Sequence, residues 1–247
     1  MAEIVRERGR AKVDDLARLF GVSTQTVRKD VNAMCERGLL RRVHGGVELG
    51  GANADHYELR RILNFEAKRR IGRAAARLIP NEAVLAASIG TTPELVVACL
   101  GQRSGLHIYS NNLHLAMTAN RFHGIEATIP GGKLRKSEAD IVGASAVSFF
   151  DSYKYDIGLF GVAAVDEAGG LLDLSDDDVE SRKAISRNAA KRILVLDASK
   201  FGRSAHVRSG DVADVDHVIC DARPPEPIYA RLLAAGVDVV ICDEASI

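Results

Sequence analysis

Residues 22–46 read Val-Ser-Thr-Gln-Thr-Val-Arg-Lys-Asp-Val-Asn-Ala-Met-Cys-Glu-Arg-Gly-Leu-Leu-Arg-Arg-Val-His-Gly-Gly and contain the signals of a capped helix followed by a short hairpin. Ser23 suits the helix N-cap because its hydroxyl can accept a hydrogen bond from a free backbone N–H. Gly38 suits the C-terminal end of the same helix. Between these two ends, Val27, Val31 and Met34 recur at i, i+4 and i+7, which predicts one apolar face.

The remaining face of this helix is polar and basic. Gln can form paired hydrogen bonds with adenine and Arg with guanine, whereas Lys usually meets a phosphate. This face therefore predicts contact with double-stranded DNA, and Gln25 and Arg28 are the first candidates for base contact. The predicted DNA-contacting residues on the helix are Ser23, Thr24, Gln25, Arg28, Lys29 and Asn32.

A second amphipathic helix precedes the first, and a basic hairpin follows it. Residues 13–20 place apolar side chains at i, i+3, i+4 and i+7, and Gly21-Val22 is a short link of the kind that a helix-turn-helix requires. Residues 39–47 suit a strand that turns at Gly45-Gly46. Arg41, Arg42 and His44 would lie on this wing, near the DNA backbone or the minor groove. The order of elements predicts a winged helix-turn-helix.

Segments 23–31 and 38–46 resemble the signature of the DeoR family of bacterial transcriptional regulators. The resemblance implies a winged helix-turn-helix followed by a larger domain that senses sugar phosphates. In that family the first helix usually begins several residues earlier, whereas only Met1 to Arg8 are available for it here. We therefore expect the native start to lie upstream of Met1.

Charge and cysteine usage agree with this organisation. Residues 1–50 carry a net charge of +3 and the remainder carries −3, which suits a basic DNA-binding head on an acidic body. The four cysteines are scattered and form no Cys-x-x-Cys pair, so they are expected to be reduced core residues rather than metal ligands. The sequence contains no signal peptide and no apolar run long enough to span a membrane. We expect a cytoplasmic protein without a metal or another cofactor.

The chain is predicted to form two domains: residues 1–56 bind DNA, and residues 57–247 bind an effector and oligomerise. Residues 48–56 suit a loop, and residues 57–79 predict a linker helix with an apolar stripe that includes Ile71 and Ala75. Further along, short β-rich runs alternate with helical patterns, which predicts an α/β domain on a largely parallel sheet. The predicted strands are 84–87, 106–109, 127–129, 157–160, 193–196, 218–220 and 237–241, and the predicted helices include 93–100, 113–121 and 179–191.

Polar loops follow four of these strands. Ligands of open α/β sheets bind at the carboxyl ends of the strands. Residues 88–92 read Ser-Ile-Gly-Thr-Thr before a helix, where free N–H groups and hydroxyls suit an anion. The other three loops are Ser110-Asn-Asn112, Pro130-Gly-Gly-Lys133 and Asp197-Ala-Ser-Lys-Phe201. A purely structural role remains open for each, since Gly-Thr-Thr can cap a helix and Gly-Gly can form a turn.

The resemblance to the DeoR family extends to these loops, which occur there in the same order. It implies a fold similar to ribose-5-phosphate isomerase and CoA-transferase domains, with phosphate held at the Gly-Thr-Thr turn. Ser88 departs from the family, which often has an acidic residue there, so the identity of the ligand stays open. Glu180 and Lys183 are weaker candidates that could equally form an exposed helical ion pair. The predicted ligand-binding residues are Ser88, Gly90, Thr91, Thr92, Asn111, Asn112, Gly131, Gly132 and Lys200.

Three functions remain in view. The first is a DNA-binding regulator, a repressor of a sugar-metabolism operon that a phosphorylated sugar releases from its operator, acting as a dimer or a higher oligomer. The second is a sugar-phosphate isomerase fused to a DNA-binding head, for which Asp197 would be the remaining candidate base. The third is a DNA-binding protein whose second domain only oligomerises. The sequence names neither the sugar nor the operator, and it leaves repressor and activator open.

Overall fold

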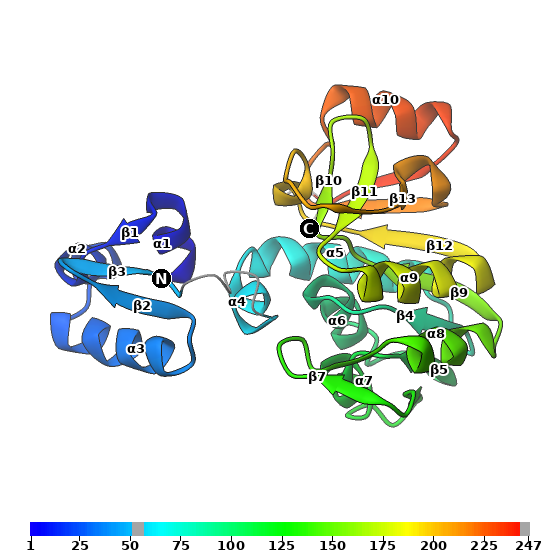
Figure 1. The fold of residues 1–247 in the computed structure, drawn as a ribbon, viewed down its shortest axis with the longest axis horizontal. Coiled ribbons are helices and arrows are strands. Elements are labelled where there is room, and N and C mark those ends of the chain that lie inside the picture. The colour runs from blue at the N-terminus through cyan, green and yellow to red at the C-terminus, as the bar shows by residue number, and fades with distance from the viewer. Residues whose placement is uncertain (51–56, 243–247) are drawn as a thin grey trace. The chain divides into compact units, whose positions relative to one another are not determined.

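The computed structural model describes residues 1–50 and 57–242 and divides into two compact units, Met1–Phe65 and Glu66–Ile247 (Figure 1). The domain boundary predicted at residue 56 and most of the predicted loop 48–56 lie outside the described residues. The helix that follows this segment groups with the first unit.

The first unit is a winged helix-turn-helix, as the sequence predicts (Figure 1). Its core contains Val27 and Val31 from the recognition helix, which are both fully buried. The wing turns at His44-Gly45 rather than at Gly45-Gly46, because Gly46 already pairs with Val43 as the first residue of the returning strand. Its helices are α1 (Ala2–Arg8), α2 (Val13–Phe20) and α3 (Thr24–Glu36), and its sheet has the order β1 (Arg10–Ala11), β3 (Gly46–Leu49), β2 (Leu40–Val43).

The linker helix predicted for residues 57–79 is in fact two helices, α4 (Tyr57–Ile62) and α5 (Phe65–Leu78). The interruption occurs at Asn64, whose φ of 54° lies in the left-handed region. Asn adopts this conformation more readily than most residues because its short polar side chain can hydrogen-bond locally. Sequence patterning overlooked the break because the segment contains neither proline nor glycine at this point.

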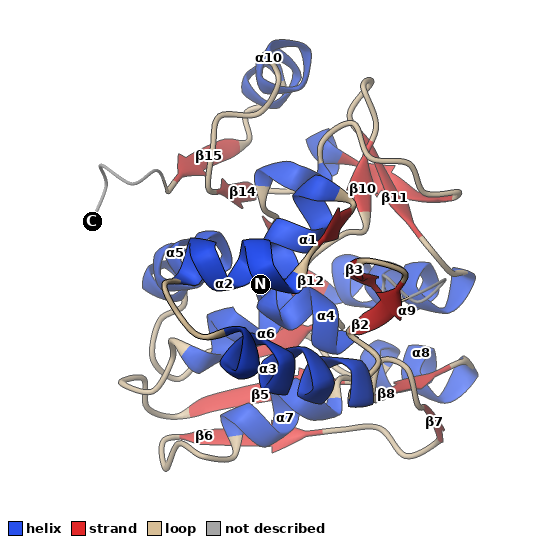
Figure 2. Ribbon diagram, turned by 90° about the vertical axis from the view of Figure 1, so that its left-hand side faces the viewer, coloured by secondary structure: helices blue, strands red, loops and turns tan. Residues whose placement is uncertain are grey.

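The second unit is built on a seven-stranded parallel sheet with the order β15-β14-β12-β9-β4-β5-β6. Figure 2 labels β15, β14 and β12 towards one end of this sheet and β5 and β6 towards the other. All seven predicted strands are present, because each contains a short run of β-favouring apolar residues. The strands are β4 (Val84–Ala87), β5 (Leu106–Ser110), β6 (Ile125–Thr128), β9 (Tyr155–Phe160), β12 (Ala189–Val195), β14 (His217–Cys220) and β15 (Asp238–Ile241).

Helices cover both faces of this sheet, which gives two apolar clusters on opposite sides of the strands. The helix predicted for 179–191 ends at Asn188, because Ala189 already begins β12. No helix among the described residues is both long and apolar enough to cross a lipid bilayer. The helices of this unit besides α5 are α6 (Thr91–Ala98), α7 (Leu113–Ala119), α8 (Ala144–Asp151), α9 (Asp176–Asn188) and α10 (Glu226–Ala234), with 3-10 turns η1 (Ala198–Lys200) and η2 (Val212–Asp214).

Two small antiparallel additions were not predicted from the sequence. One is the hairpin of β7 (Lys133–Arg135) and β8 (Asp140–Val142), which follows the Gly131-Gly132 turn. The other is the three-stranded sheet β10-β11-β13. These strands are short and carry polar residues, so they lack the apolar runs that reveal the main sheet. Their bounds are β10 (Ala164–Val165), β11 (Gly170–Asp173) and β13 (Val207–Asp211).

Candidate DNA interface and effector site

The recognition helix α3 begins at the predicted cap. The Ser23 hydroxyl accepts a hydrogen bond from the backbone N–H of Thr26 at 3.1 Å. Capping in this way satisfies one of the N–H groups that a helix start leaves free. Ser23 therefore fixes the start of the recognition helix.

Every predicted DNA-contacting residue of the first unit is exposed. Arg28 and Lys29 lie next to each other on the exposed side of α3, and within residues 1–50 and 57–242 neither has an ion-pair or hydrogen-bond partner. Gln25, about one turn earlier, is likewise exposed and has no side-chain partner among the described residues. Their donors are thus available to base edges and phosphates. The exposed candidates are Ser23, Thr24, Gln25, Arg28, Lys29, Asn32, Arg41, Arg42 and His44.

The wing is tied to the recognition helix by side-chain contacts. Arg42 donates a hydrogen bond to the side-chain oxygen of Asn32, and Arg41 forms an ion pair with Glu48 on the opposite strand. Because Asn32 and Arg42 contact each other, we assign them to holding the wing against α3. Of the residues predicted here, Gln25, Arg28 and Lys29 are the best placed to contact DNA.

In the second unit, three of the four predicted ligand loops leave adjacent parallel strands. Ala87 at the end of β4 is in register with Ser110 at the end of β5, so Ser88 and Asn111 follow neighbouring strand ends. β6 lies next to β5 and leads into the Gly131-Gly132 loop. Lys200 follows β12, which only β9 separates from β4. The four loops therefore share one edge of the sheet, as the sequence predicts.

The Gly90-Thr91-Thr92 turn forms the start of α6. Gly90 is the N-cap with a φ of 135°, a conformation that L side chains rarely adopt, which accounts for glycine here. Thr91 and Thr92 are buried in the first turn of the helix. The Nζ of Lys68 donates a hydrogen bond to the Thr91 hydroxyl at 3.1 Å. This turn thus combines a helix N-terminus, two hydroxyls and a buried cation, which together suit a phosphate.

Asn111 and Asn112 play different parts at the end of β5. The Asn112 side chain caps α7 by accepting from the backbone N–H groups of His114 and Leu115, so its oxygen holds the start of that helix. Asn111 is also buried, and its Nδ2 donates to the carbonyl of Ile141 at 2.9 Å. Its Oδ1 is buried without a hydrogen-bond partner among the described residues. A buried acceptor in that state is costly, and a hydroxyl of a ligand would satisfy it.

The Gly131-Gly132 loop leads into the β7–β8 hairpin. A Cβ on Gly132 would come within 2.4 Å of the Ser145 hydroxyl, and its φ of 151° is unfavourable for other residues. Gly131 has open space around it. The hairpin returns to the strand ends, where the backbone N–H of Ile141 donates to the carbonyl of Asn111 at 2.8 Å. Gly132 is therefore required for the hairpin to fold back, whereas Gly131 is free to approach a ligand.

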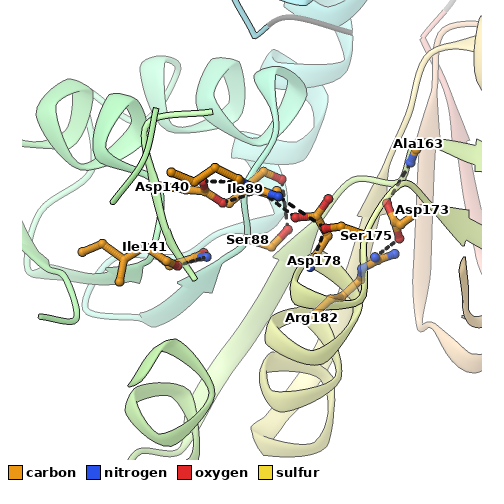
Figure 3. Close-up of polar contacts among 11 residues, drawn as sticks. Ser88, Ile89, Asp140, Ile141, Ala163, Asp173, Ser175, Asp178 and Arg182 are labelled. Carbon is orange, nitrogen blue, oxygen red and sulfur yellow. Dashed lines mark hydrogen bonds and ion pairs between the residues drawn. The ribbon is translucent and has the colours of Figure 1, made fainter. Parts of the chain in front are cut away.

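An ionic cluster ties this hairpin to the start of α9 (Figure 3). Arg135 donates to the two carboxylate oxygens of Asp140 at 2.9 and 2.7 Å and to Asp178 at 2.6 Å. Asp140 is fully buried, and burial raises its pKa although the guanidinium opposes the effect. Figure 3 labels Asp140 and Asp178 of this cluster together with Ser88 and Ile89 from the loop after β4. The cluster thus holds the β7–β8 hairpin against the start of α9, which lies about 40 residues later in the sequence.

The loop after β12 is held by Asp197. Its Oδ1 accepts from the backbone N–H of Ser199 at 3.1 Å and caps the short turn η1. Lys200 ends this turn, with its side chain half-buried. The Ser88 hydroxyl donates to the neighbouring carbonyl of Ile89 at 3.2 Å.

The weaker candidates Glu180 and Lys183 form an exposed ion pair on α9 at 3.1 Å, in agreement with the structural alternative. A pocket of about 320 Å³ is lined in part by Lys183 and other residues of α9, and it contains none of the residues predicted on the four strand-end loops. Its cations are already matched by carboxylates, so it offers no unpaired positive charge to an anion. The pairs are Arg182–Asp173, Lys183–Glu180, Arg187–Asp151 and Arg192–Asp216.

Sequence reasoning missed Lys68 and the Arg135 cluster. Lys68 falls three residues before Ile71 and seven before Ala75, so it occupies the apolar stripe of α5, but it is not among the predicted ligand-binding residues. A lysine at a stripe position was the available signal. The Arg135 cluster gave no local signal, because its partner Asp178 lies 43 residues away. All four cysteines are free thiols, and no metal-ligand cluster occurs in residues 1–50 and 57–242, the part of the chain with described structure.

Comparison with known proteins places both units in one family. A model described as a DeoR-like helix-turn-helix domain matches residues 1–51, and one described as the DeoR C terminal sensor domain matches residues 63–222. The glycerol-3-phosphate regulon repressor of Escherichia coli is 35% identical over 241 residues, covering 97% of this chain and 96% of that protein.

Two further comparisons are with a second repressor and with a solved structure. The E. coli transcriptional repressor CsqR is 33% identical over 242 residues, covering 98% of this chain and 93% of its own. The structure of ribose 5-phosphate isomerase A from Methanocaldococcus jannaschii is 19% identical, covers 56% of this chain and 55% of that one, and has a TM-score of 0.42.

Proposed function

The chain belongs to the DeoR family of transcriptional regulators, and from this premise we propose that it is a repressor of a sugar-related operon that a phosphorylated sugar or polyol releases from DNA. Relatives that match along nearly the whole chain are named as repressors, and it is not an enzyme. The proposal places the protein in the cytoplasm, where its DNA target lies.

The observation that carries the effector half of this proposal is the Gly90-Thr91-Thr92 turn with Lys68 beside it. Free N–H groups at a helix start, together with hydroxyls and an ammonium group, are the usual partners of a phosphate. The partnerless Oδ1 of Asn111 at the neighbouring strand end suits a hydroxyl of the same ligand. A phosphorylated polyol supplies both groups, and the name of the E. coli relative makes glycerol 3-phosphate the first compound to test.

The DNA half rests on α3 and its exposed, unengaged Arg28 and Lys29. One winged helix contacts a short half-site, so we propose that two or more copies of the chain read repeated half-sites about one helical turn of DNA or a multiple of it apart. An effector that binds the DNA-incompetent arrangement more tightly would shift the population towards it and release the operator.

Selection of bound duplexes from a random library tests the DNA half directly. We expect a recurring sequence with two related half-sites, and analytical ultracentrifugation of the complex should show at least two protein chains per duplex. Enrichment of no sequence would overturn sequence-specific binding, and one chain per duplex would overturn the oligomer.

A thermal-shift screen with inorganic phosphate, free sugars and sugar phosphates tests the effector half. A ligand that binds the folded state raises the melting temperature by mass action. We expect a phosphorylated compound to produce a shift that the double variant Thr91→Ala/Thr92→Ala loses. If none of the compounds changes the melting temperature, the result would support the alternative in which the second unit only oligomerises.

A further inference from the structure

We propose that Lys68 is the residue through which a phosphate bound at the Gly90-Thr91-Thr92 turn acts on the DNA-reading unit. The inference rests on the proposed function and adds to it a residue and a route. Lys68 belongs to α5, the first helix of the second unit, and the chain enters this helix directly from the first unit.

Lys68 occupies a position where an apolar residue would normally lie. Its side chain is only 3% exposed, and it shares the buried stripe of α5 with Ile71 and Ala75, which are fully buried. Burying an ammonium group costs more than burying an apolar side chain of similar volume. Its Nζ contacts the Thr91 hydroxyl, so the charge is positioned at the turn where the anion is expected.

A second observation points to a ligand at the same edge of the sheet. The Oδ1 of Asn111 is buried and has no hydrogen-bond partner among the described residues, and Asn111 leaves the strand next to the one that leads to Thr91. The cation and the acceptor together suit a molecule with a phosphate at one end and a hydroxyl at the other.

The beginning of α5 is held by the first helix of the chain. Asn64 precedes the helix, its backbone N–H donates to the Glu3 carboxylate at 2.7 Å, and its Oδ1 accepts from Arg6 at 3.0 Å. Lys68 follows Asn64 by four residues, which is about one helical turn. A displacement of Lys68 therefore reaches a residue that α1 holds.

The short helix α4 is joined to the recognition helix as well. Arg37, the C-cap residue of α3, donates a hydrogen bond to Glu58 of α4 at 3.0 Å. Leu59 and Leu63 are buried in a cluster with Leu39 of the first unit. Because α4 and Asn64 are anchored to the DNA-reading unit, the Asn64–Phe65 junction is where reorientation of α5 would be transmitted. A ligand that binds Lys68 better in one orientation of α5 shifts the equilibrium towards that orientation.

The test compares Lys68→Met with Arg77→Met, a control on the same helix that removes the same charge from an exposed position. Methionine retains the apolar stem and removes the ammonium group. The probes are inorganic phosphate and glycerol 3-phosphate, with binding followed by calorimetry. Release of a selected operator duplex from the full-length protein is followed by fluorescence anisotropy.

We expect Lys68→Met to bind each probe about 10- to 100-fold more weakly, as loss of one charge-assisted contact implies, and its release of DNA is measured from its own preformed operator complex. The probe concentration for half-release should rise by the same factor, Lys68→Arg should restore part of it, and Arg77→Met should resemble the wild type. If Lys68→Met does not melt cooperatively, Lys68→Gln takes its place in the same assays.

The outcomes separate the two proposals. If the wild type responds to a probe, and Lys68→Met shows the same probe affinity and the same release of DNA, the role of Lys68 is overturned. The phosphate site at the turn would still stand. A lower melting temperature with unchanged probe affinity would show a merely structural role and overturn it as well. A wild type that neither binds a probe nor releases operator overturns the phosphate site, and the role of Lys68 with it.

Discussion

Replacing Arg28 with alanine should weaken operator binding in a way that depends on the sequence of the operator. Arg28 lies on the exposed side of α3, in the second turn after the Ser23 cap, and no described residue engages its guanidinium. Its donors can therefore all be used on DNA. A paired contact from Arg to guanine discriminates against another base by about 1–3 kcal/mol, and we expect a loss of about 5- to 150-fold per half-site.

Lys29→Ala is the matched comparison, because it removes the same charge from the adjacent exposed position. A phosphate contact carries no sequence information, so Lys29→Ala should weaken binding to selected and random duplexes alike. The slope of log affinity against log salt concentration should become shallower by about one unit. The free energy of unfolding of both variants should lie within about 0.5 kcal/mol of the wild-type value, since both side chains are on the surface.

The assay is fluorescence anisotropy with a selected duplex and with duplexes altered at single base pairs, at several salt concentrations. Arg28→Ala should lose its preference at one base pair of each half-site, whereas Lys29→Ala should retain every preference. If Arg28→Ala loses affinity equally for all duplexes, the assignment of Arg28 as a residue that contacts a base is refuted. The exposed face of α3 would then act only through the DNA backbone.

Three further predictions concern stability and coupling. Asp173→Asn leaves the buried guanidinium of Arg182 without its carboxylate and should lower the free energy of unfolding by about 3–5 kcal/mol in a denaturant titration; an unchanged midpoint would show that the pair contributes little. The Arg187 guanidinium lowers the pKa of Asp151, so the pair stabilises the fold above the ordinary carboxylate pKa and is lost as the pH falls; Asp151→Asn should cost less than about 1 kcal/mol near pH 7 because the pair is exposed, and a deficit that persists at pH 2–3 would contradict this account. Asn64→Ala places alanine at a left-handed position and removes an acceptor of Arg6, so it should reduce the change in operator affinity on adding the effector, with operator binding itself retained; an undiminished change would exclude this junction from the route.

Much of the fold could be predicted because the deciding signals are local. The cap at Ser23 and the stripe of Val27 and Val31 fix the recognition helix within a few residues of sequence. The seven main strands are short apolar runs, and their order in a parallel sheet brings the loops after β4, β5, β6 and β12 to one edge without further information.

The missing parts depend on contacts between distant segments. Lys68 stands in the charged run Lys68-Arg69-Arg70. Only the packing of α5 within the second unit shows that Lys68 is buried. The break at Asn64 has no proline or glycine to mark it, and its partners Glu3 and Arg6 lie about 60 residues earlier. The structural roles of Asn112 and Gly132 likewise required the positions of α7 and Ser145.

The measurement that tests the central claim most directly is a titration of the preformed protein–operator complex with glycerol 3-phosphate and a panel of other phosphorylated sugars. We predict that at least one of them returns the anisotropy of the labelled duplex to that of free DNA, and that the Thr91→Ala/Thr92→Ala protein keeps the duplex bound under the same conditions. A complex that persists at saturating concentrations of every phosphorylated compound, or a double variant that releases DNA as readily as the wild type, would contradict the account.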